Sequence, residues 1–402
     1  RLDKNFNEAE KILLEIIKQF PNFIQAYLNL SNLYFENKIS IKAKEIALRG
    51  LNINPKNPET LMNLGFICRN LGEINEAKQY LLRALSINRK LFNSYMNLST
   101  FYDFSDNPKE LEYLMNVPLE GINQEDIIRI YFSRAHIYHN QKKFSDSSKN
   151  YKLANDCKSR IYPSNKISLI EKSLKIKEIY FNEKEDLKKF NVKSPDLIFI
   201  VGMPRSGSTL LENILSLNQG VVDLGEIEIL PEIMDQCIAS SIEINPFEKY
   251  IEQLNKLQPK AKIATDKNLF NYMFCPVIDK YFKNTKMIFC LRNPLDNILS
   301  IYRSNFIKIP FSTNVEDIAE LYVHHYELMK LYSETYSNNL FVYSYDKLVM
   351  NPTVQIRKII DWLGWDWSEK YLSPHKSKRS VFTASSEQVR NPIHTKSLRS
   401  WE

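Results

Sequence analysis

The sequence predicts two domains of different class: an N-terminal all-α domain built from helical repeats, and a C-terminal α/β domain with a parallel sheet. Apolar residues recur with a fixed period in the first part of the chain, and short apolar runs alternate with amphipathic helices after Pro195. A chain of 402 residues is also long for a single hydrophobic core. We expect a repeat domain over 1–158, a linker helix within 159–194, and the α/β domain over 195–402.

Composition excludes several classes of protein. A hydrophobic content of 44% and a charged content of 25% are typical of a folded globular chain. The central apolar run Leu197–Val201 is far too short for a membrane span, so we expect none. The basic residues form no stripe interleaved with aromatics, which counts against nucleic-acid binding. The net charge of +7 suits an anionic ligand, although a lysine-rich surface accounts for most of it equally well.

The cysteines favour a reducing compartment. The five are scattered, and no two form a C-x-x-C pair, which argues against a disulfide framework and a zinc site. No acidic cluster suited to magnesium is visible, so we expect no metal. The sequence also shows no basic-then-apolar leader, and we therefore expect a cytoplasmic location.

The N-terminal part repeats with a period of 34 residues. The clearest sets are Ala9, Ala43 and Ala77, and Leu30, Leu64 and Leu98. Small residues at fixed offsets let paired helices approach closely, while large ones fill the space between them. This register resembles the tetratricopeptide repeat over about 1–104, with a further unit at about 125–157 and an irregular stretch between. Such a solenoid either binds a peptide or protein partner or only braces its neighbour, and both interpretations stay open.

After a charged helix predicted over 166–190, the pattern changes at Ser194-Pro195 to strands alternating with helices. The expected strands are Leu197–Val201, Val221–Leu224, Lys262–Ala264, Met287–Leu291 and Leu340–Tyr343. Helices between them predict a parallel sheet covered on both faces. Unusual polar residues follow four of these strands: the loop 202–209, Glu226, Lys267 and Arg292. Ligands of such sheets bind at the carboxyl ends of the strands, so we expect one crevice there.

The loop Gly202-Met203-Pro204-Arg205-Ser206-Gly207-Ser208-Thr209 has the character of an anion cradle. A strand, a Gly/Ser loop and a helix N-terminus together direct free backbone N–H groups at a ligand. The loop is not that of a nucleotide triphosphatase, because G-x-x-x-x-G-K-[ST] places Lys where this chain has Ser208.

This loop resembles the 5′-phosphosulfate loop of sulfotransferases, P-R-S-G-[ST]-[ST]. Arg292-Asn293-Pro294, with Ser300 eight residues after the Arg, resembles the 3′-phosphate site of that family, and Tyr345-Asp346-Lys347-Leu348 resembles its stretch entering a late helix. The resemblance covers about 195–402. It implies an α/β P-loop-type sulfotransferase domain, 3′-phosphoadenosine 5′-phosphosulfate as the donor and 3′,5′-diphosphoadenosine as the product, without a metal.

Within that family the closer likeness is to tyrosylprotein sulfotransferases and to bacterial relatives that carry tetratricopeptide repeats. Gly225-Glu226 matches their catalytic carboxylate, Lys267 their catalytic lysine, and Ser385 a serine near the sulfonate. Two departures leave the acceptor and the adenosine contacts open: Asn391 stands where the animal enzymes have Lys, and Arg303 falls one position early.

The resemblance assigns roles to the site residues. The catalytic set is Glu226, Lys267, Arg205 and Ser385. The donor-binding set is Arg205, Ser206, Gly207, Ser208, Thr209, Arg292, Ser300 and Tyr345. We expect Glu226 to remove the acceptor proton, with Glu228 as a rival base, while Lys267 and Arg205 neutralise charge on the transferring group.

Two functions of other classes compete with this one: a non-catalytic nucleotide-binding protein that presents partners on its repeats, and a nucleotide kinase. Intact Glu226 and Lys267 count against the first, and the missing Gly-Lys-[ST] against the second. The acceptor is open among a peptide tyrosine, a sugar hydroxyl and a small metabolite. His324-His325 lies mid-helix among large apolar residues, which favours packing histidines over a base or metal pair.

Overall fold

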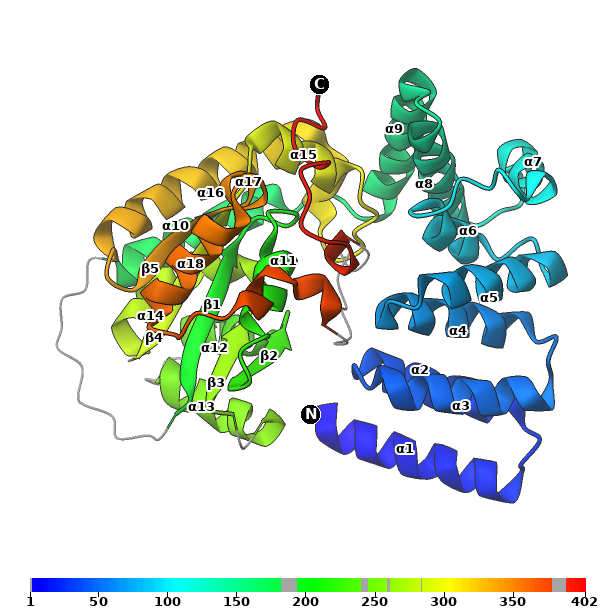
Figure 1. Ribbon diagram of the computed structural model, residues 1–402, viewed down its shortest axis with the longest axis horizontal. Coiled ribbons are helices and arrows are strands. Elements are labelled where there is room, and N and C mark those ends of the chain that lie inside the picture. The colour runs from blue at the N-terminus through cyan, green and yellow to red at the C-terminus, as the bar shows by residue number, and fades with distance from the viewer. Residues whose placement is uncertain (1, 182–193, 240–244, 259–260, 283, 378–387) are drawn as a thin grey trace. The chain divides into compact units, whose positions relative to one another are not determined.

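The computed structural model describes residues 2–181, 194–239, 245–258, 261–282, 284–377 and 388–402. The chain forms two compact units (Figure 1), the first ending at Tyr162 and the second comprising Pro163–Ser377 with Val389–Glu402. Each unit has hydrophobic clusters of its own. The first unit ends at residue 162, four residues after the expected end of the repeat domain at 158, because a helix continues through residue 158.

The first unit is all-α, as predicted. Its helices are α1 Leu2–Gln19, α2 Ile24–Glu36, α3 Ser40–Ile53, α4 Pro58–Leu71, α5 Ile74–Ile87, α6 Phe92–Ser99, α7 Pro108–Asn116, α8 Gln124–Asn140 and α9 Phe144–Ile161. They pack as successive pairs, most closely α2 with α3, α4 with α5, and α8 with α9. The short helix α7 lies in the irregular stretch between the regular repeats, whereas the short helix α6 carries the repeat residue Leu98.

The residues that recur every 34 positions form the core of this unit. Leu30, Leu64 and Leu98 have no exposed surface, and Ala43 is equally buried. Gly65 shows why small residues are needed, because a Cβ built there lies only 2.5 Å from Cγ of Leu81 on the paired helix. The close approach of α4 and α5 therefore depends on a residue without a side chain.

The second unit is built on a five-stranded parallel sheet. Its strands are β1 Asp196–Gly202, β2 Val221–Gly225, β3 Ile263–Asp266, β4 Thr285–Leu291 and β5 Leu340–Ser344. They lie in the order β2-β3-β1-β4-β5, and every neighbouring pair is parallel. The predicted fold class is confirmed, with strand bounds within two residues of those expected.

Helices cover both faces of the sheet (Figure 1). They are α10 Lys166–Tyr180, α11 Ser208–Leu215, α12 Ile229–Ala239, α13 Pro246–Leu257, α14 Cys275–Tyr281, α15 Pro294–Tyr302, α16 Val315–Thr335, α17 Tyr345–Met350 and α18 Pro352–Leu363. The 3-10 segments are η1 Leu269–Phe274, η2 Pro310–Thr313, η3 Glu369–Leu372, η4 Pro374–Lys376 and η5 Gln388–Arg390. Two of these helices, α12 and α13, lie between β2 and β3 in the sequence.

The two faces of the sheet can be followed in β1. Phe199 and Val201 point into a cluster with residues of α10, α12, α13, α14 and α16, whereas Ile198 and Ile200 join a second cluster with α11, α17 and α18. Because β1 is buried on both faces, all of its side chains from 197 to 201 are apolar, and they do not alternate with polar ones. Helix α10, expected as part of a linker, packs against η1, α14 and α16 and is thus part of the second unit.

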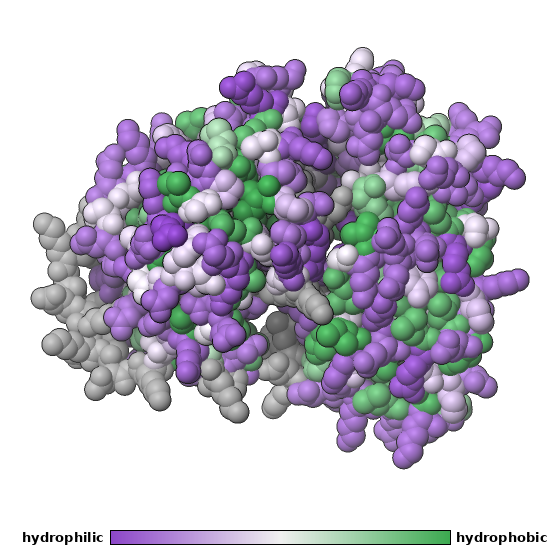
Figure 2. Space-filling model, in the orientation of Figure 1, coloured by the Kyte–Doolittle hydropathy of each residue, from purple (hydrophilic) through white to green (hydrophobic). Residues whose placement is uncertain are grey.

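The surface gives no sign of a membrane-spanning helix. None of the helices in the described ranges is both long and apolar enough to cross a bilayer. The face drawn in Figure 2 is mostly hydrophilic, with smaller hydrophobic patches on both units.

Replacing Gly65 with Ala should destabilise the first unit. The added Cβ would lie 2.5 Å from Leu81 Cγ, and overpacking of this kind typically costs about 1–3 kcal/mol. The measurement is thermal and urea unfolding followed by circular dichroism. In the double variant Gly65→Ala/Leu81→Ala the new methyl group fills space that the leucine vacated, so we expect it to be more stable than the sum of the single effects. Strict additivity would contradict this account.

Candidate active site

The polar residues predicted for the site lie at the carboxyl ends of all five strands. In the order of the sheet, Glu226 follows β2, Lys267 follows β3, the Gly/Ser loop follows β1, Arg292 follows β4 and Tyr345 follows β5. Because the strands are parallel, these ends share one edge of the sheet. The edge thus carries an acid–lysine pair on one side of the loop and Arg292 with Tyr345 on the other.

The loop after β1 has a backbone suited to binding an anion. Arg205 and Gly207 adopt positive φ angles of 66° and 88°. Gly207 is the N-cap of α11 and makes no side-chain cap, so the first N–H groups of the helix have no partner from the helix or from that residue. A Cβ at Gly207 would lie 2.3 Å from Cδ2 of Tyr345, so the close ring and the positive φ both require glycine.

Hydrogen bonds join the loop to the end of β4 and to α15. Arg205 Nε donates to Ser300 Oγ at 2.9 Å, and Arg292 Nη1 donates to the carbonyl of Arg205 at 2.9 Å. Burial and the neighbouring Arg292 guanidinium lower the pKa of Arg205 to about 10, which still leaves it charged at neutral pH. Three predicted donor-binding residues, far apart in sequence, are therefore in direct contact.

Arg292 is held from several directions. Its Nη2 donates to the carbonyl of Ser397 at 2.8 Å, and its guanidinium lies 5.1 Å from the centre of the Tyr345 ring. The hydroxyl of Tyr322 donates to the Arg292 carbonyl at 2.8 Å. The Nε of Arg292 is buried and has no hydrogen-bond partner in the described part of the chain. Arg292 therefore keeps one buried donor that a ligand can use.

Sequence reasoning missed the residues that brace this region. Asn297 Nδ2 donates to the carbonyl of Pro204 at 2.8 Å and fixes the loop from α15. The buried carboxylate of Asp296 accepts the backbone N–H groups of Arg399 and Ser400 at 2.8 and 2.7 Å, which ties the C-terminal segment to the same helix. The sequence feature that could have indicated them is the pair of adjacent polar residues, Asp296 and Asn297, in the first turn of the helix that begins at Pro294.

Lys267 and Glu226 form a direct ion pair. Lys267 Nζ donates to Glu226 Oε1 at 2.8 Å, and Glu212 Oε2 lies 3.8 Å from the same nitrogen. Burial by itself would lower the pKa of Lys267, but the carboxylates of Glu212 and Glu226 more than offset this and hold it above the ordinary value. The lysine is 1% exposed, whereas the Glu226 side chain is 54% exposed. A buried charge thus faces a carboxylate that can reach solvent.

The backbone explains why the pair forms. The register of β2 against β3 shifts between Asp223 and Gly225, and Gly225 has a positive φ of 67°. Such a bulge bends the strand and redirects the next side chain. The N–H of Lys267 then donates to the carbonyl of Gly225 at 2.9 Å, which places residues 226 and 267 side by side.

The rival base Glu228 has a different partner. Its Oε2 accepts from Asn268 Nδ2 at 3.2 Å, and the same amide donates to the carbonyl of Ile227 at 2.9 Å. Glu226, and not Glu228, is therefore the carboxylate that contacts Lys267.

Asp266, just before the lysine, is a buried structural acid. It accepts from the Tyr250 hydroxyl and from the Asn268 N–H, both at 2.9 Å. Burial raises its pKa to about 7, against the effect of these hydrogen bonds, and the nearby Glu212 carboxylate raises it further. Its role is to fix the backbone from which Lys267 projects.

The two adjacent histidines pack as the sequence indicated. His325 is buried among the rings of Tyr272, Phe289 and Tyr322, with the Tyr272 ring centre 4.6 Å away. Burial, with a small contribution from His324, lowers the pKa of His325 to about 3. His324 Nε2 lies 2.6 Å from the hydroxyl of Ser173.

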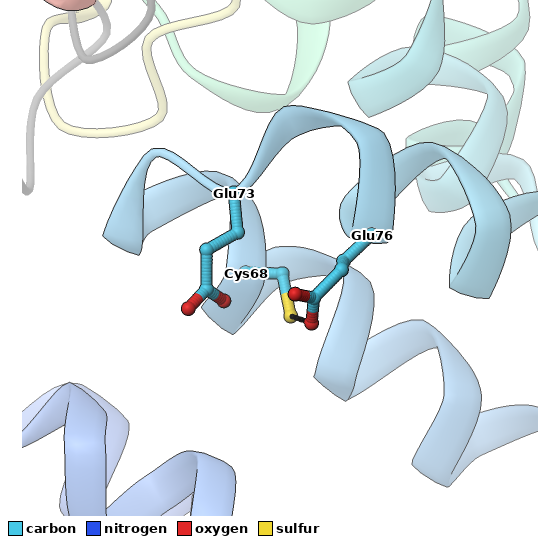
Figure 3. A group of neighbouring side chains, drawn as sticks. All are labelled: Cys68, Glu73 and Glu76. Atoms are coloured by element: carbon cyan, nitrogen blue, oxygen red, sulfur yellow. Dashed lines mark hydrogen bonds between the residues drawn. The ribbon is translucent and has the colours of Figure 1, made fainter.

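One group of potential metal ligands lies in the first unit. Cys68 of α4 and Glu76 of α5 point toward one another and toward Glu73, which precedes α5 (Figure 3). Lys44 Nζ lies 2.6 Å from Glu73 and 2.7 Å from Glu76, so one ammonium group already pairs with both carboxylates. Burial raises the pKa of the Cys68 thiol, which keeps it protonated. The group is explained as an ion pair between repeats.

Ser385, the remaining predicted catalytic residue, lies outside the described residues. The other predicted site residues are all brought to the one edge of the sheet.

This fold and site define an α/β domain whose strand ends carry groups suited to an anion. Residues 195–244 and 240–369 match the model of the sulfotransferase family, and residues 58–91 match the tetratricopeptide repeat. The match to the sulfotransferase family thus lies in the second unit, and the match to the tetratricopeptide repeat lies in the first.

Several known proteins are similar to this chain in sequence or in structure. An uncharacterized protein of Aquifex aeolicus is 23% identical over 100% of the chain and 56% of its own length. A putative protein-tyrosine sulfotransferase of Caenorhabditis briggsae is 28% identical over 51% of the chain and 80% of its own length. The chain thus spans about half the length of the Aquifex relative. Among solved structures, the sulfotransferase domain from the curacin biosynthetic pathway matches with a TM-score of 0.41 and 17% identity, over 52% of this chain and 91% of that domain.

Replacing His325 with Phe should remove part of the acid sensitivity of the second unit. The folded pKa is about 3 and the ordinary value is 6.5, so between them the unfolded chain binds a proton that the folded chain does not. Stability is therefore lost as pH falls below about 6.5, by about 2 kcal/mol at pH 5 for this group. Urea unfolding followed by tryptophan fluorescence measures it at pH 7 and pH 5. Equal pH dependence in the variant and the wild type would contradict the assignment.

Proposed function

We propose that this chain transfers a sulfuryl group from 3′-phosphoadenosine 5′-phosphosulfate to an acceptor hydroxyl by direct in-line transfer, with Glu226 as the base. The single observation that carries the proposal is the contact between buried Lys267 and exposed Glu226, one strand away from the anion-binding loop. In-line transfer needs a base on the hydroxyl, a cation at the leaving oxygen and a cradle for the phosphate, and these three are neighbours here.

The donor-binding residues fit a molecule with two separate phosphates. The loop residues Ser206–Thr209 and the N-terminus of α11 suit the 5′-phosphate, because backbone N–H groups and the helix dipole both favour an anion. Arg292, with its unpartnered Nε, and Ser300 suit the 3′-phosphate. The Tyr345 ring lies next to Gly207 and also faces the Arg292 guanidinium, so it supports the residues proposed for both phosphates.

The order of the strands supports one orientation of the donor. Arg292 follows β4 on one side of the loop, and Lys267 follows β3 on the other. A donor with its 3′-phosphate on Arg292 and its 5′-phosphate on the loop directs its sulfate end toward Lys267 and Glu226.

In the proposed reaction, each bond that forms is matched by a bond that breaks. Glu226 accepts the proton of the acceptor hydroxyl, the acceptor oxygen bonds to sulfur, and the bond between sulfur and the 5′-phosphate oxygen breaks. Lys267 and Arg205 compensate the charge on the leaving oxygen and the transferring SO₃ group. The exposed Glu226 must leave Lys267 to reach the acceptor, and its exposure permits this. General-base assistance is worth about 10²–10⁴ in rate. Ser385 stays a predicted member of the set.

The proposal extends to a hydroxyl acceptor (a peptide tyrosine, a sugar or a metabolite), to a peptide or protein partner on the repeats, and to a cytoplasmic location. A nucleotide kinase fits less well, because Ser208 stands where the phosphate-binding lysine is needed. A non-catalytic nucleotide-binding scaffold would have no use for a buried lysine paired with an exposed carboxylate.

Calorimetry should show micromolar or tighter binding of 3′,5′-diphosphoadenosine, and weaker binding of 5′-AMP and ATP. Replacing Arg292 with Lys removes a planar cation with several fixed donors, and should weaken diphosphate binding by about 10–100-fold. The conservative change limits damage to the bonds that Arg292 makes with residues 205 and 397.

The matched control is Arg357→Lys, which alters an exposed cation on α18 and should bind like the wild type. ATP binding as tight as that of the diphosphate would refute the proposed donor and favour the kinase.

Glu226→Gln should lower sulfuryl transfer by about 10²–10⁴-fold without weakening diphosphate binding, because the base contacts the acceptor and not the phosphates. The assay follows labelled sulfate from the donor into a panel of phenolic, sugar and small-alcohol acceptors. Glu228→Gln is the matched comparison and should keep most of the rate. The opposite ranking would reassign the base to Glu228.

A further inference from the structure

Glu212 is a second carboxylate on the site lysine, and neither the sequence motifs nor the proposed mechanism uses it. It lies in α11, the helix that begins at the anion-binding loop. Residue 212 is four positions after Ser208, so the two lie on the same side of that helix, one turn apart. An acid in the middle of an apolar helix and 4% exposed needs a cation to compensate its charge.

The two carboxylates around Lys267 differ in a way that separates their roles. Glu226 is nearer, at 2.8 Å, but its side chain is 54% exposed. Glu212 is at 3.8 Å, beyond hydrogen-bond distance, and its side chain is 5% exposed. Water screens an exposed pair strongly and a buried one weakly, so the longer contact is not the weaker attraction.

The mechanism makes this difference matter. Glu226 must turn from the lysine to take the acceptor proton, and at that moment a buried ammonium with no other partner would be costly. We propose, on the basis of the proposed function, that Glu212 is a positioning residue: it holds Lys267 in place as a charged group while Glu226 moves to the acceptor. The anion-binding helix thereby sets the position of the lysine at the leaving oxygen.

In the described part of the chain, the titratable side chains that interact with Lys267 are Glu212 on α11, Glu226 after β2 and Cys290 on β4. Asp266 precedes the lysine at the end of β3. Burial raises the pKa of the Cys290 thiol and, to about 7, that of Asp266, so neither supplies a full negative charge at neutral pH. Glu212 is the buried acid left to balance the lysine.

The test reads the charge of Lys267 directly, without donor or acceptor. Protein labelled with ¹³C at the lysine ε-carbon is titrated by NMR, and the resonance of Lys267 is assigned by its loss in Lys267→Met. Glu212→Gln keeps the volume of the side chain, and should lower the pH at which Lys267 titrates by about one unit or more. Glu334→Gln, an exposed acid on α16, is the matched control and should leave the titration unchanged.

A second variant keeps the proposal testable if Glu212→Gln fails to fold by circular dichroism. In Glu226→Gln the lysine should still titrate no lower than an ordinary lysine, because Glu212 remains. An unchanged titration in Glu212→Gln, or a titration in Glu226→Gln below that of an ordinary lysine, would overturn the proposal.

The pH dependence of sulfuryl transfer gives an independent test of the same proposal. Lys267 must be protonated to assist the leaving oxygen, so a lower pKa moves the alkaline limb of the pH–rate profile to lower pH by the same shift. Absence of transfer in the wild type with every acceptor would count against the proposed function alone, because the NMR titration still decides whether Glu212 holds the lysine.

Discussion

The burial of cations at one edge of the parallel sheet is the constraint on which the second unit depends. Lys267 and Arg292 are 1% and 8% exposed, and a buried cation is tolerated only with partners. The fold supplies them from distant parts of the chain: Glu212 and Glu226 for the lysine, and backbone carbonyls for the arginine. Satisfying these charges fixes the loop, the bulge in β2 and the start of α15 in one arrangement. The binding edge is therefore preformed.

Much of this arrangement can be predicted from sequence, because it follows from short patterns. Period 34 places Leu30 and Leu64 in the core, and a run such as 197–201 predicts a strand buried on both faces. The carboxyl-end rule for parallel sheets then brings Glu226, Lys267 and Arg292 to one edge without knowledge of the strand order. The loop motif identifies the glycine that the Tyr345 ring requires.

The parts that sequence reasoning missed are contacts between segments that no pattern links. Nothing in the run around residue 212 says that its acid meets a lysine 55 positions later, and Asp296 gives no sign that it will bind the backbone of residues 399 and 400. The sequence predicts α10 as a linker helix, because its many charged residues obscure the side that packs on η1 and α16.

The distance in sequence between contacting segments also affects the order in which the protein folds. The repeats are held by contacts between neighbouring helices, so each pair can form as soon as it is made. The strand at the centre of the sheet, β1, has its partners β3 and β4 later in the chain, and Arg292 bonds to residues 205 and 397 on either side of it in sequence. This edge of the sheet is complete only after residue 397 has been synthesised. The repeats of the nascent chain can therefore fold well before the strand-end site of the second unit is complete.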